Sequence, residues 1–149
     1  MKVGVTGTRE GMILEQRKAF CSMCCCDPSS TVDINLATEF HHGSCRGVDV
    51  QAARIVNDLC NLDCEIHCHP GPSDDPNQEN SGVDTVIHEP KNHFARNRDI
   101  VDAVDLLIVV PREKPLGSLG GTVYTAGYAR KKGKRAIIIW PDGTVEDMQ

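Results

Sequence analysis

Two uninterrupted apolar runs of strand length, Leu106–Val110 and Ala136–Trp140, constrain the fold of this chain more than any other feature. Strands that are apolar at every position are buried on both faces, which is typical of parallel sheets covered by helices. Segments with helical spacing stand between the apolar runs and can supply the crossovers that parallel strands need. The alternation of strand and helix therefore predicts an α/β fold with a mainly parallel sheet.

The same pattern predicts about five strands, with helices on both faces of the sheet. Right-handed connections between parallel strands then favour a Rossmann-like, doubly wound arrangement in a single domain over residues 1–149. A long irregular loop, rich in proline, glycine and polar residues, is expected at 71–84. The expected strands are Lys2–Thr6, Ala37–His42, Asp63–His69, Asp105–Val110 and Arg135–Trp140, with Thr85–His88 as a candidate for a further short strand. The expected helices are Met12–Cys26, Val48–Leu59, Asn92–Val104 and Thr122–Lys132.

The composition is that of an ordinary soluble globular protein, with 149 residues, of which 40% are hydrophobic and 25% charged. The apolar runs are far too short to span a membrane. Near the N-terminus, Gly7, Arg9 and Glu10 interrupt any apolar segment of the kind found in signal peptides. We therefore expect a cytoplasmic protein without a membrane partner.

Charge is divided unevenly along the chain. Residues 1–90 carry a net charge of −8, residues 91–135 carry +6, and the whole chain carries −5. Because nucleic-acid affinity comes mainly from neutralised phosphates, an acidic chain with a pI of about 5.6 is a poor general binder of DNA or RNA. A local basic surface can still hold a small anion. The charge pattern thus favours a phosphate-bearing small molecule as the partner.

Cysteine and histidine do not form a recognisable metal motif. Cys21-x-x-Cys24 has the spacing of a zinc knuckle, but the obvious second pair, Cys64 and Cys68, falls within a predicted strand. The eight cysteines are interpreted as small buried side chains, with a structural zinc site as the alternative. The six histidines have no H-E-x-x-H spacing. The sequence therefore predicts no metal ligands and no cofactor.

Loops rich in glycine, hydroxyl or basic residues follow several of the predicted strands. Ligands of doubly wound sheets bind outside the carboxyl ends of the strands, so these loops are expected to form one binding rim. A further basic segment opens the helix that follows the 71–84 loop, which should return the chain to this rim. The candidate ligand-binding residues are Gly7, Thr8, Arg9, Gly43, Ser44, Arg46, Gly47, Asp49, Arg96, Asn97, Gly117, Ser118, Gly120, Gly121 and Thr122.

The loop Gly117–Thr122 has the composition of an anion site, because its glycines admit close backbone approach and the following helix offers free N–H groups. It matches neither the mononucleotide P-loop nor the G-x-G-x-x-G fingerprint. Arg9 and Arg96 supply planar guanidinium groups suited to phosphate. The hydroxyls of Thr8 and Thr122 are each interpreted either as a ligand contact or as a helix cap. Asp49 is interpreted either as an acid that complements the helix dipole or as an acceptor for a ribose hydroxyl.

Taken in order, four motifs resemble the SLOG superfamily. They are Val5–Arg9 (VTGTR), His42–Asp49 (HGSCRGVD), Arg96–Asp102 (RNRDIVD) and Gly117–Ala126 (GSLGGTVYTA). That superfamily joins the Lonely Guy phosphoribohydrolases, the DNA-processing protein A domain and nucleotide-sensing domains of bacterial immune effectors. The resemblance covers nearly the whole chain, with the 71–84 loop matched least. It implies a Rossmann-like fold that binds nucleotides or nucleotide-derived signals, often as a homo-oligomer.

The chain departs from the hydrolytic members of that superfamily at one position of their motif. Those members carry P-G-G-x-G-T followed closely by a glutamate that acts on the glycosidic bond, whereas Val123, Tyr124 and Thr125 follow here. The arginine that precedes the motif in the family corresponds to Arg96. Without a carboxylate, N-glycosidic hydrolysis loses its main chemical group, and no catalytic residue is assigned.

The resemblance therefore favours a binding protein, either a sensor or a sponge that sequesters a nucleotide-derived signal. Two alternatives stay open. One is a nucleoside 5′-monophosphate N-glycosidase of the Lonely Guy type, in which Asp49 or another acid of the rim replaces the missing glutamate. The other is a DNA-binding protein of the DNA-processing protein A type, which the acidic charge balance disfavours.

Overall fold

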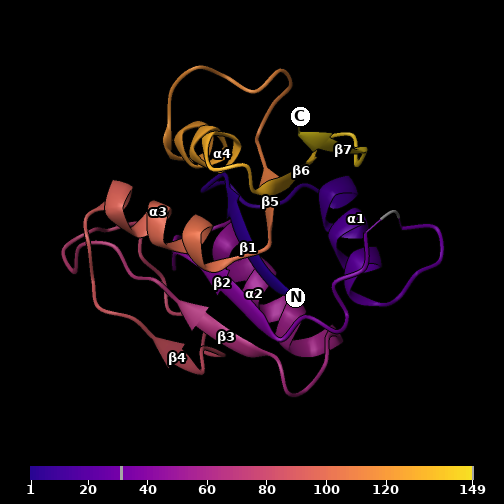
Figure 1. Ribbon diagram of the computed structural model, residues 1–149, viewed down its shortest axis with the longest axis horizontal. Helices are drawn as coiled ribbons and strands as arrows, with labels where there is room; N and C mark the ends of the chain where they lie inside the picture. Colours follow the sequence, from indigo (N-terminus) through magenta and orange to yellow (C-terminus); the bar gives the residue numbers. More distant parts are fainter. Residues whose placement is uncertain (31, 149) are drawn as a thin grey trace.

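The computed structural model describes residues 1–30 and 32–148 and contains one seven-stranded sheet, in the order β4-β3-β2-β1-β5-β6-β7 (Figure 1). Neighbouring strands run parallel except at β7, which is antiparallel to β6. The strands are β1 (Lys2–Gly7), β2 (Glu39–His42), β3 (Glu65–Cys68), β4 (Val86–Ile87), β5 (Leu106–Val110), β6 (Arg135–Ile139) and β7 (Val145–Met148). The mainly parallel α/β sheet expected from the sequence is confirmed.

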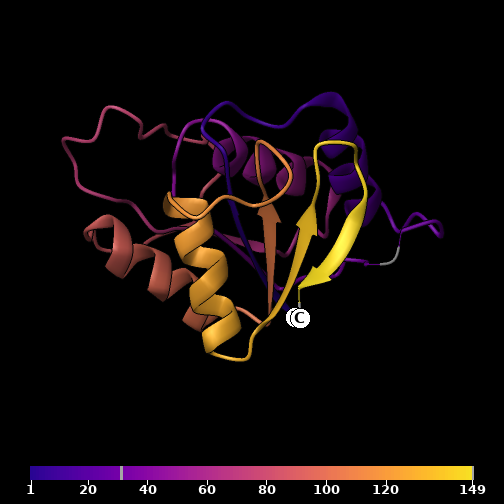
Figure 2. The same cartoon turned by 90° about the horizontal axis from the view of Figure 1, so that it is seen from above.

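Helices cover both faces of this sheet, as predicted. The helices are α1 (Leu14–Cys24), α2 (Val48–Leu59), α3 (His93–Ala103) and α4 (Gly121–Lys131). Helices α1 and α2 pack on one face, where Phe20 and Phe40 belong to the larger hydrophobic core. On the other face, seen in Figure 2, α3 and α4 pack against alternate residues of β5 and β6 and form a smaller core that includes Ile100 and Leu107.

The described part of the chain forms seven strands, so the prediction of about five was wrong. Strand β4 falls within the segment that the sequence offered as a candidate short strand, but β7 was not predicted at all. β7 has the sequence Val-Glu-Asp-Met and lies at the edge of the sheet, half-buried or exposed at every position. It pairs with β6 through a tight turn in which Trp140 N–H donates to Thr144 O at 2.9 Å. The other strands were predicted from continuous apolar runs, and an edge strand of this kind has none.

The sheet order changes direction between β1 and β5. From β1 the chain builds outward through β2, β3 and β4 on one side, and then crosses back to start the other side with β5. The crevice outside the carboxyl ends of such a pair is where ligands of doubly wound folds bind. The loops after β1 and β5 therefore define where a functional site is expected. None of the helices among the described residues is long and apolar enough to cross a membrane.

The 71–84 loop lacks regular structure but is fastened to the loop after β2. Arg46 N–H donates to Asn77 O at 2.8 Å, and Glu79 N–H donates to Ser44 O at 2.8 Å. The Ser44 hydroxyl donates to Glu79 O at 2.6 Å, and Arg46 Nε donates to Asn77 Oδ1 at 3.0 Å. Two residues predicted to bind ligand, Ser44 and Arg46, thus hold one side of the rim in place.

Candidate functional site

The turn after β1 is fixed to both neighbouring parts of the rim. Thr8 N–H donates to Val110 O at 3.1 Å, at the end of β5. Thr8 O in turn accepts from Val48 N–H at 3.1 Å, at the start of α2. Gly47 has φ of 91°, and a Cβ there would lie 2.5 Å from Arg9 O. The loops after β1 and β2 therefore touch along their backbones, and glycine is required at that contact.

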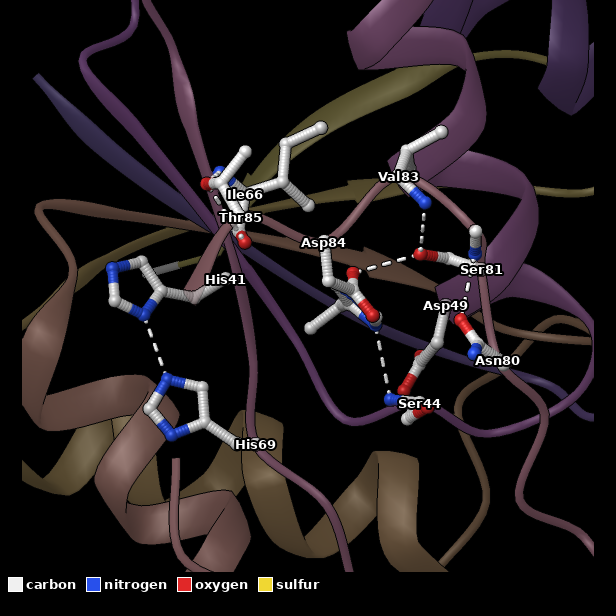
Figure 3. Close-up of polar contacts among 12 residues, drawn as sticks. His41, Ser44, Asp49, Ile66, His69, Asn80, Ser81, Val83, Asp84 and Thr85 are labelled. Atoms are coloured by element: carbon white, nitrogen blue, oxygen red, sulfur yellow. Dashed lines mark hydrogen bonds and ion pairs between the residues drawn. The ribbon is translucent and has the colours of Figure 1, made fainter. Parts of the chain in front are cut away.

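Asp49 is turned inward, into the loop that precedes it (Figure 3). Its Oδ2 accepts from Gly43 N–H at 3.0 Å and from Cys45 N–H at 3.4 Å, and the residue is only 7% exposed. Burial raises the pKa of this carboxyl, while the nearby His42 and Arg96 oppose the rise. Asp49 lies in the first turn of α2, and it holds the loop after β2 in shape by accepting hydrogen bonds from the backbone of that loop. Neither of the two roles expected from the sequence included this contact.

Arg96 is also buried, with 4% of its surface exposed, and its guanidinium binds protein groups. Nη1 donates to Gly43 O and, at 3.2 Å, to His69 O. Nε donates to Asn97 Oδ1 at 2.7 Å, so the candidate Asn97 supports the arginine. Arg96 therefore fastens α3 to the ends of β2 and β3, instead of facing the crevice as the sequence interpretation expected.

A cavity of about 200 Å³ lies at the switch point between β1 and β5. It is lined by Thr8 from the β1 turn, by the segment that follows β5, and by the first residues of α4. Five of the predicted site residues line it: Thr8, Gly117, Gly120, Gly121 and Thr122. The other candidates, which are Gly7, Arg9, Gly43, Ser44, Arg46, Gly47, Asp49, Arg96, Asn97 and Ser118, do not line this cavity among the described residues.

The first turn of α4 has the character of an anion site. The N-cap position is Gly120, with φ of 114° and no side-chain cap, so Thr122 does not cap the helix. The first N–H groups of any α-helix have no partner within the helix, and they lie at the positive end of its dipole. Because residues at this end line the cavity, an anion there would meet backbone donors directly.

Two charged residues of the cavity were missed by the sequence interpretation. Arg112 and Glu113 follow β5 directly and both line the cavity. Arg112 Nη1 donates to Glu10 Oε1 at 3.2 Å, and the Thr8 hydroxyl also donates to the Glu10 carboxylate. The Thr8 contact lowers the pKa of Glu10 most, and the positive charge of Arg112 also lowers it. The sequence did carry a signal for these two residues. Arg112 and Glu113 come almost directly after the apolar run of β5, which ends at the rim.

The sequence interpretation also missed a histidine cluster. His41, His67, His69 and His88 come from three neighbouring strands or their ends, and their rings stack on one face of the sheet. Their proximity depends on strand register, which spacing along the chain does not reveal. One signal was present in the sequence: β2 and β3 both begin with glutamate, an apolar residue and histidine.

The chemistry that this rim can perform is the capture of a small anion. A helix N-terminus, a hydroxyl and an exposed guanidinium face one cavity at the switch point of the sheet. Its volume of about 200 Å³ is below the usual range of drug-sized sites, and it is open to solvent, so it can hold the phosphate end of a ligand. Comparisons with protein-family models, curated proteins and solved structures found no match to this chain.

Proposed function

We propose that this protein binds a small molecule of the nucleotide class through its phosphate, in the cavity between β1 and β5, and acts as a sensor or a sponge. The observation that carries the proposal is the convergence of the α4 N-terminus, Thr8 and Arg112 on that cavity. Helix N-termini and guanidinium groups are both well suited to bind phosphate. The resemblance to the SLOG superfamily favours a nucleotide over other phosphorylated metabolites.

The test is thermal unfolding of the purified protein with mono-, di- and cyclic nucleotides and ADP-ribose, followed by chromatography of each incubated ligand. A ligand at 100 times its Kd should add about 2.7 kcal/mol to the free energy of unfolding, which raises Tm measurably. A ligand that raises Tm and is recovered unchanged supports a sensor or sponge. If neither these nucleotides nor ADP-ribose raises Tm, the proposal is wrong.

Arg112 gives the proposal a specific variant. Arg112→Ala should weaken binding of the stabilising nucleotide by about 10- to 100-fold, the usual effect of losing a hydrogen bond to a charged group. Glu10→Gln should strengthen binding, because the phosphate no longer competes with Glu10 for the guanidinium. Arg130→Ala, which removes the same charge at the far end of α4, is the matched control. Equal affinities for Arg112→Ala and Arg130→Ala, measured by isothermal titration, would contradict the assigned site.

N-glycosidic hydrolysis is the second candidate, because Glu113 places a carboxylate in the cavity although the family's glutamate position lacks one. In that case chromatography shows free base and ribose 5-phosphate above the uncatalysed background. Glu113→Gln should abolish the release while leaving the rise in Tm. DNA binding and homo-oligomer formation stay predictions, for gel-shift and light-scattering measurements respectively.

A further inference from the structure

The histidine cluster lies on the half-face of the sheet formed by β2, β3 and β4. Register pairs Glu39 with Glu65 and His41 with His67, so the two strands present the same side chains side by side. Like charges directly opposite each other are destabilising in a sheet. The central strand β5 is apolar at every position, so a row of buried polar side chains on β2 and β3 needs an explanation beyond packing.

The rings are close enough to share ligands. His41 Nδ1 lies 2.7 Å from His69 Nε2, and His67 Nδ1 lies 2.9 Å from His88 Nε2. Figure 3 shows the rings of His41 and His69 facing one another. The ring centroids of His69 and His88 are 4.0 Å apart in a stacked arrangement. Four imidazoles therefore share one small volume at the carboxyl ends of β3 and β4.

Carboxylates determine which nitrogen of each strand histidine carries a proton. His41 Nε2 lies 2.8 Å from Glu39 Oε1, and His67 Nε2 lies 3.2 Å from Glu65 Oε1. Because a carboxylate only accepts, both Nε2 atoms must carry the hydrogen. The Nδ1 atoms of His41 and His67 then have lone pairs directed at the other two rings. A ligating imidazole whose second nitrogen donates to a carboxylate is the usual arrangement at protein metal sites.

Two of these rings are almost entirely buried. His41 and His69 are 2% and 6% exposed, so the surrounding side chains hold both rings in place. His88 is partly exposed, which leaves a route from solvent to the cluster.

The spacing suits a metal after small shifts of the rings. One ring nitrogen each from His41, His69 and His88 lies within 4.8 Å of the other two. Tetrahedral zinc with Zn–N distances near 2.05 Å needs nitrogens about 3.3 Å apart. Three imidazoles without thiolates suit zinc, copper, nickel or iron better than magnesium or calcium.

A second group of possible metal ligands lies on the opposite face of the sheet and differs from the histidine cluster. His42, Cys68 and Asp84 also bring ligand atoms together. However, His42 Nδ1 accepts from Ser44 N–H at 3.0 Å, and His42 Nε2 lies 2.6 Å from Asp84 Oδ1. Asp84 accepts from the Ser81 hydroxyl at 2.7 Å as well. His42 Nδ1 is thus occupied by a backbone N–H, whereas His41 Nδ1 faces a second imidazole, so the His42 group is a closed structural network.

We propose that His41, His69 and His88 bind one divalent transition-metal ion of the zinc type, with Glu39 holding the ring of His41 in its ligating orientation. The nearby carboxylates of Glu39 and Glu65 offset the charge of the ion. His67 contacts His88 and supports its orientation. This site is separate from the cavity between β1 and β5 and does not depend on the nucleotide proposal.

The test is isothermal titration of untagged, chelator-treated protein with Zn²⁺, together with the absorption spectrum of the Co²⁺ form. Wild-type protein should bind one Zn²⁺ per chain. His88→Ala, at the partly exposed edge of the sheet, should keep the circular-dichroism spectrum and weaken binding by more than 100-fold, beyond the effect of losing a supporting carboxylate. Glu39→Gln should weaken binding by about 10- to 100-fold. His93→Ala, which removes a histidine outside the cluster, should leave the affinity unchanged.

The eight cysteines are the competing source of ligands, and the cobalt spectrum separates the two. Imidazole coordination gives d–d bands alone, whereas thiolate coordination adds charge-transfer bands in the near ultraviolet. The proposal is overturned if wild-type protein binds no stoichiometric Zn²⁺, if His88→Ala binds as tightly as wild type, or if thiolate bands appear. Nucleotide titrations take no part in this experiment, so its failure leaves the phosphate site untouched.

Discussion

Replacement of Arg96 by methionine is expected to lower the free energy of unfolding by about 3 kcal/mol. Arg96 is 4% exposed, and its guanidinium donates to the carbonyls of Gly43 and His69. Methionine fills much of the same volume but leaves these acceptors without their donor, and it removes a positive charge near the buried carboxyl of Asp49. Because α3 is joined to the ends of β2 and β3 through this side chain, the rim should loosen with it.

Urea denaturation followed by circular dichroism measures this effect. Arg98→Met is the matched control, since Arg98 lies on the same helix and binds the Tyr124 hydroxyl at a more exposed position. The control should unfold close to the wild-type midpoint. Similar midpoints for the Arg96 and Arg98 variants would show that Arg96 does not hold the rim together.

A single methyl group at position 7 should cost about 2–3 kcal/mol of stability, because a well-packed site cannot take the added volume. In Gly7→Ala the new Cβ would lie 2.6 Å from Val48 Cγ1 and 2.8 Å from Val110 O. The first contact is with the start of α2 and the second with the end of β5. The substitution therefore forces apart the elements that meet at the switch point.

Gly127→Ala is the control, and it is expected to raise the stability of the protein instead of lowering it. No atom outside its own helix lies within 4 Å of a Cβ at Gly127, in the exposed middle of α4. Alanine should stabilise the protein by about 0.5–1 kcal/mol through helix propensity. Thermal unfolding of both variants makes the comparison, and a stable Gly7→Ala protein would mean that β1 and α2 pack less tightly than described.

The fold was predicted from the sequence wherever burial dictated the residue types. β5 is buried at all five positions, and its apolar run identified it without ambiguity. Helix α3 begins after Asn92, whose side chain accepts from Ala95 N–H at 2.9 Å, a start signal that the sequence carries openly. Strand β7 was not predicted, because its pairing depends on backbone hydrogen bonds to β6. An edge strand held in this way does not need apolar side chains.

The candidate site was predicted less completely, because the sequence does not reveal the direction in which a side chain points. The glycine loop and Thr8 reached the cavity because the backbone alone places them there. Asp49 and Arg96 come from the expected loops, but their side chains turn into the protein to bind backbone groups. Sequence shows which residues reach a rim and not which way they point. The histidine cluster needed the register of β2 and β3, which is a tertiary property.

The most direct test of phosphate capture is a nuclear magnetic resonance titration of the backbone amides with ADP-ribose and 5′-AMP. If a nucleotide binds as proposed, the amides of Gly120, Gly121 and Thr122 should shift most and saturate together, with smaller changes at Thr8. Inorganic phosphate should move the same amides at higher concentration. Saturable shifts elsewhere with these three amides unmoved, or no shifts with either nucleotide, would contradict a phosphate site at the N-terminus of α4.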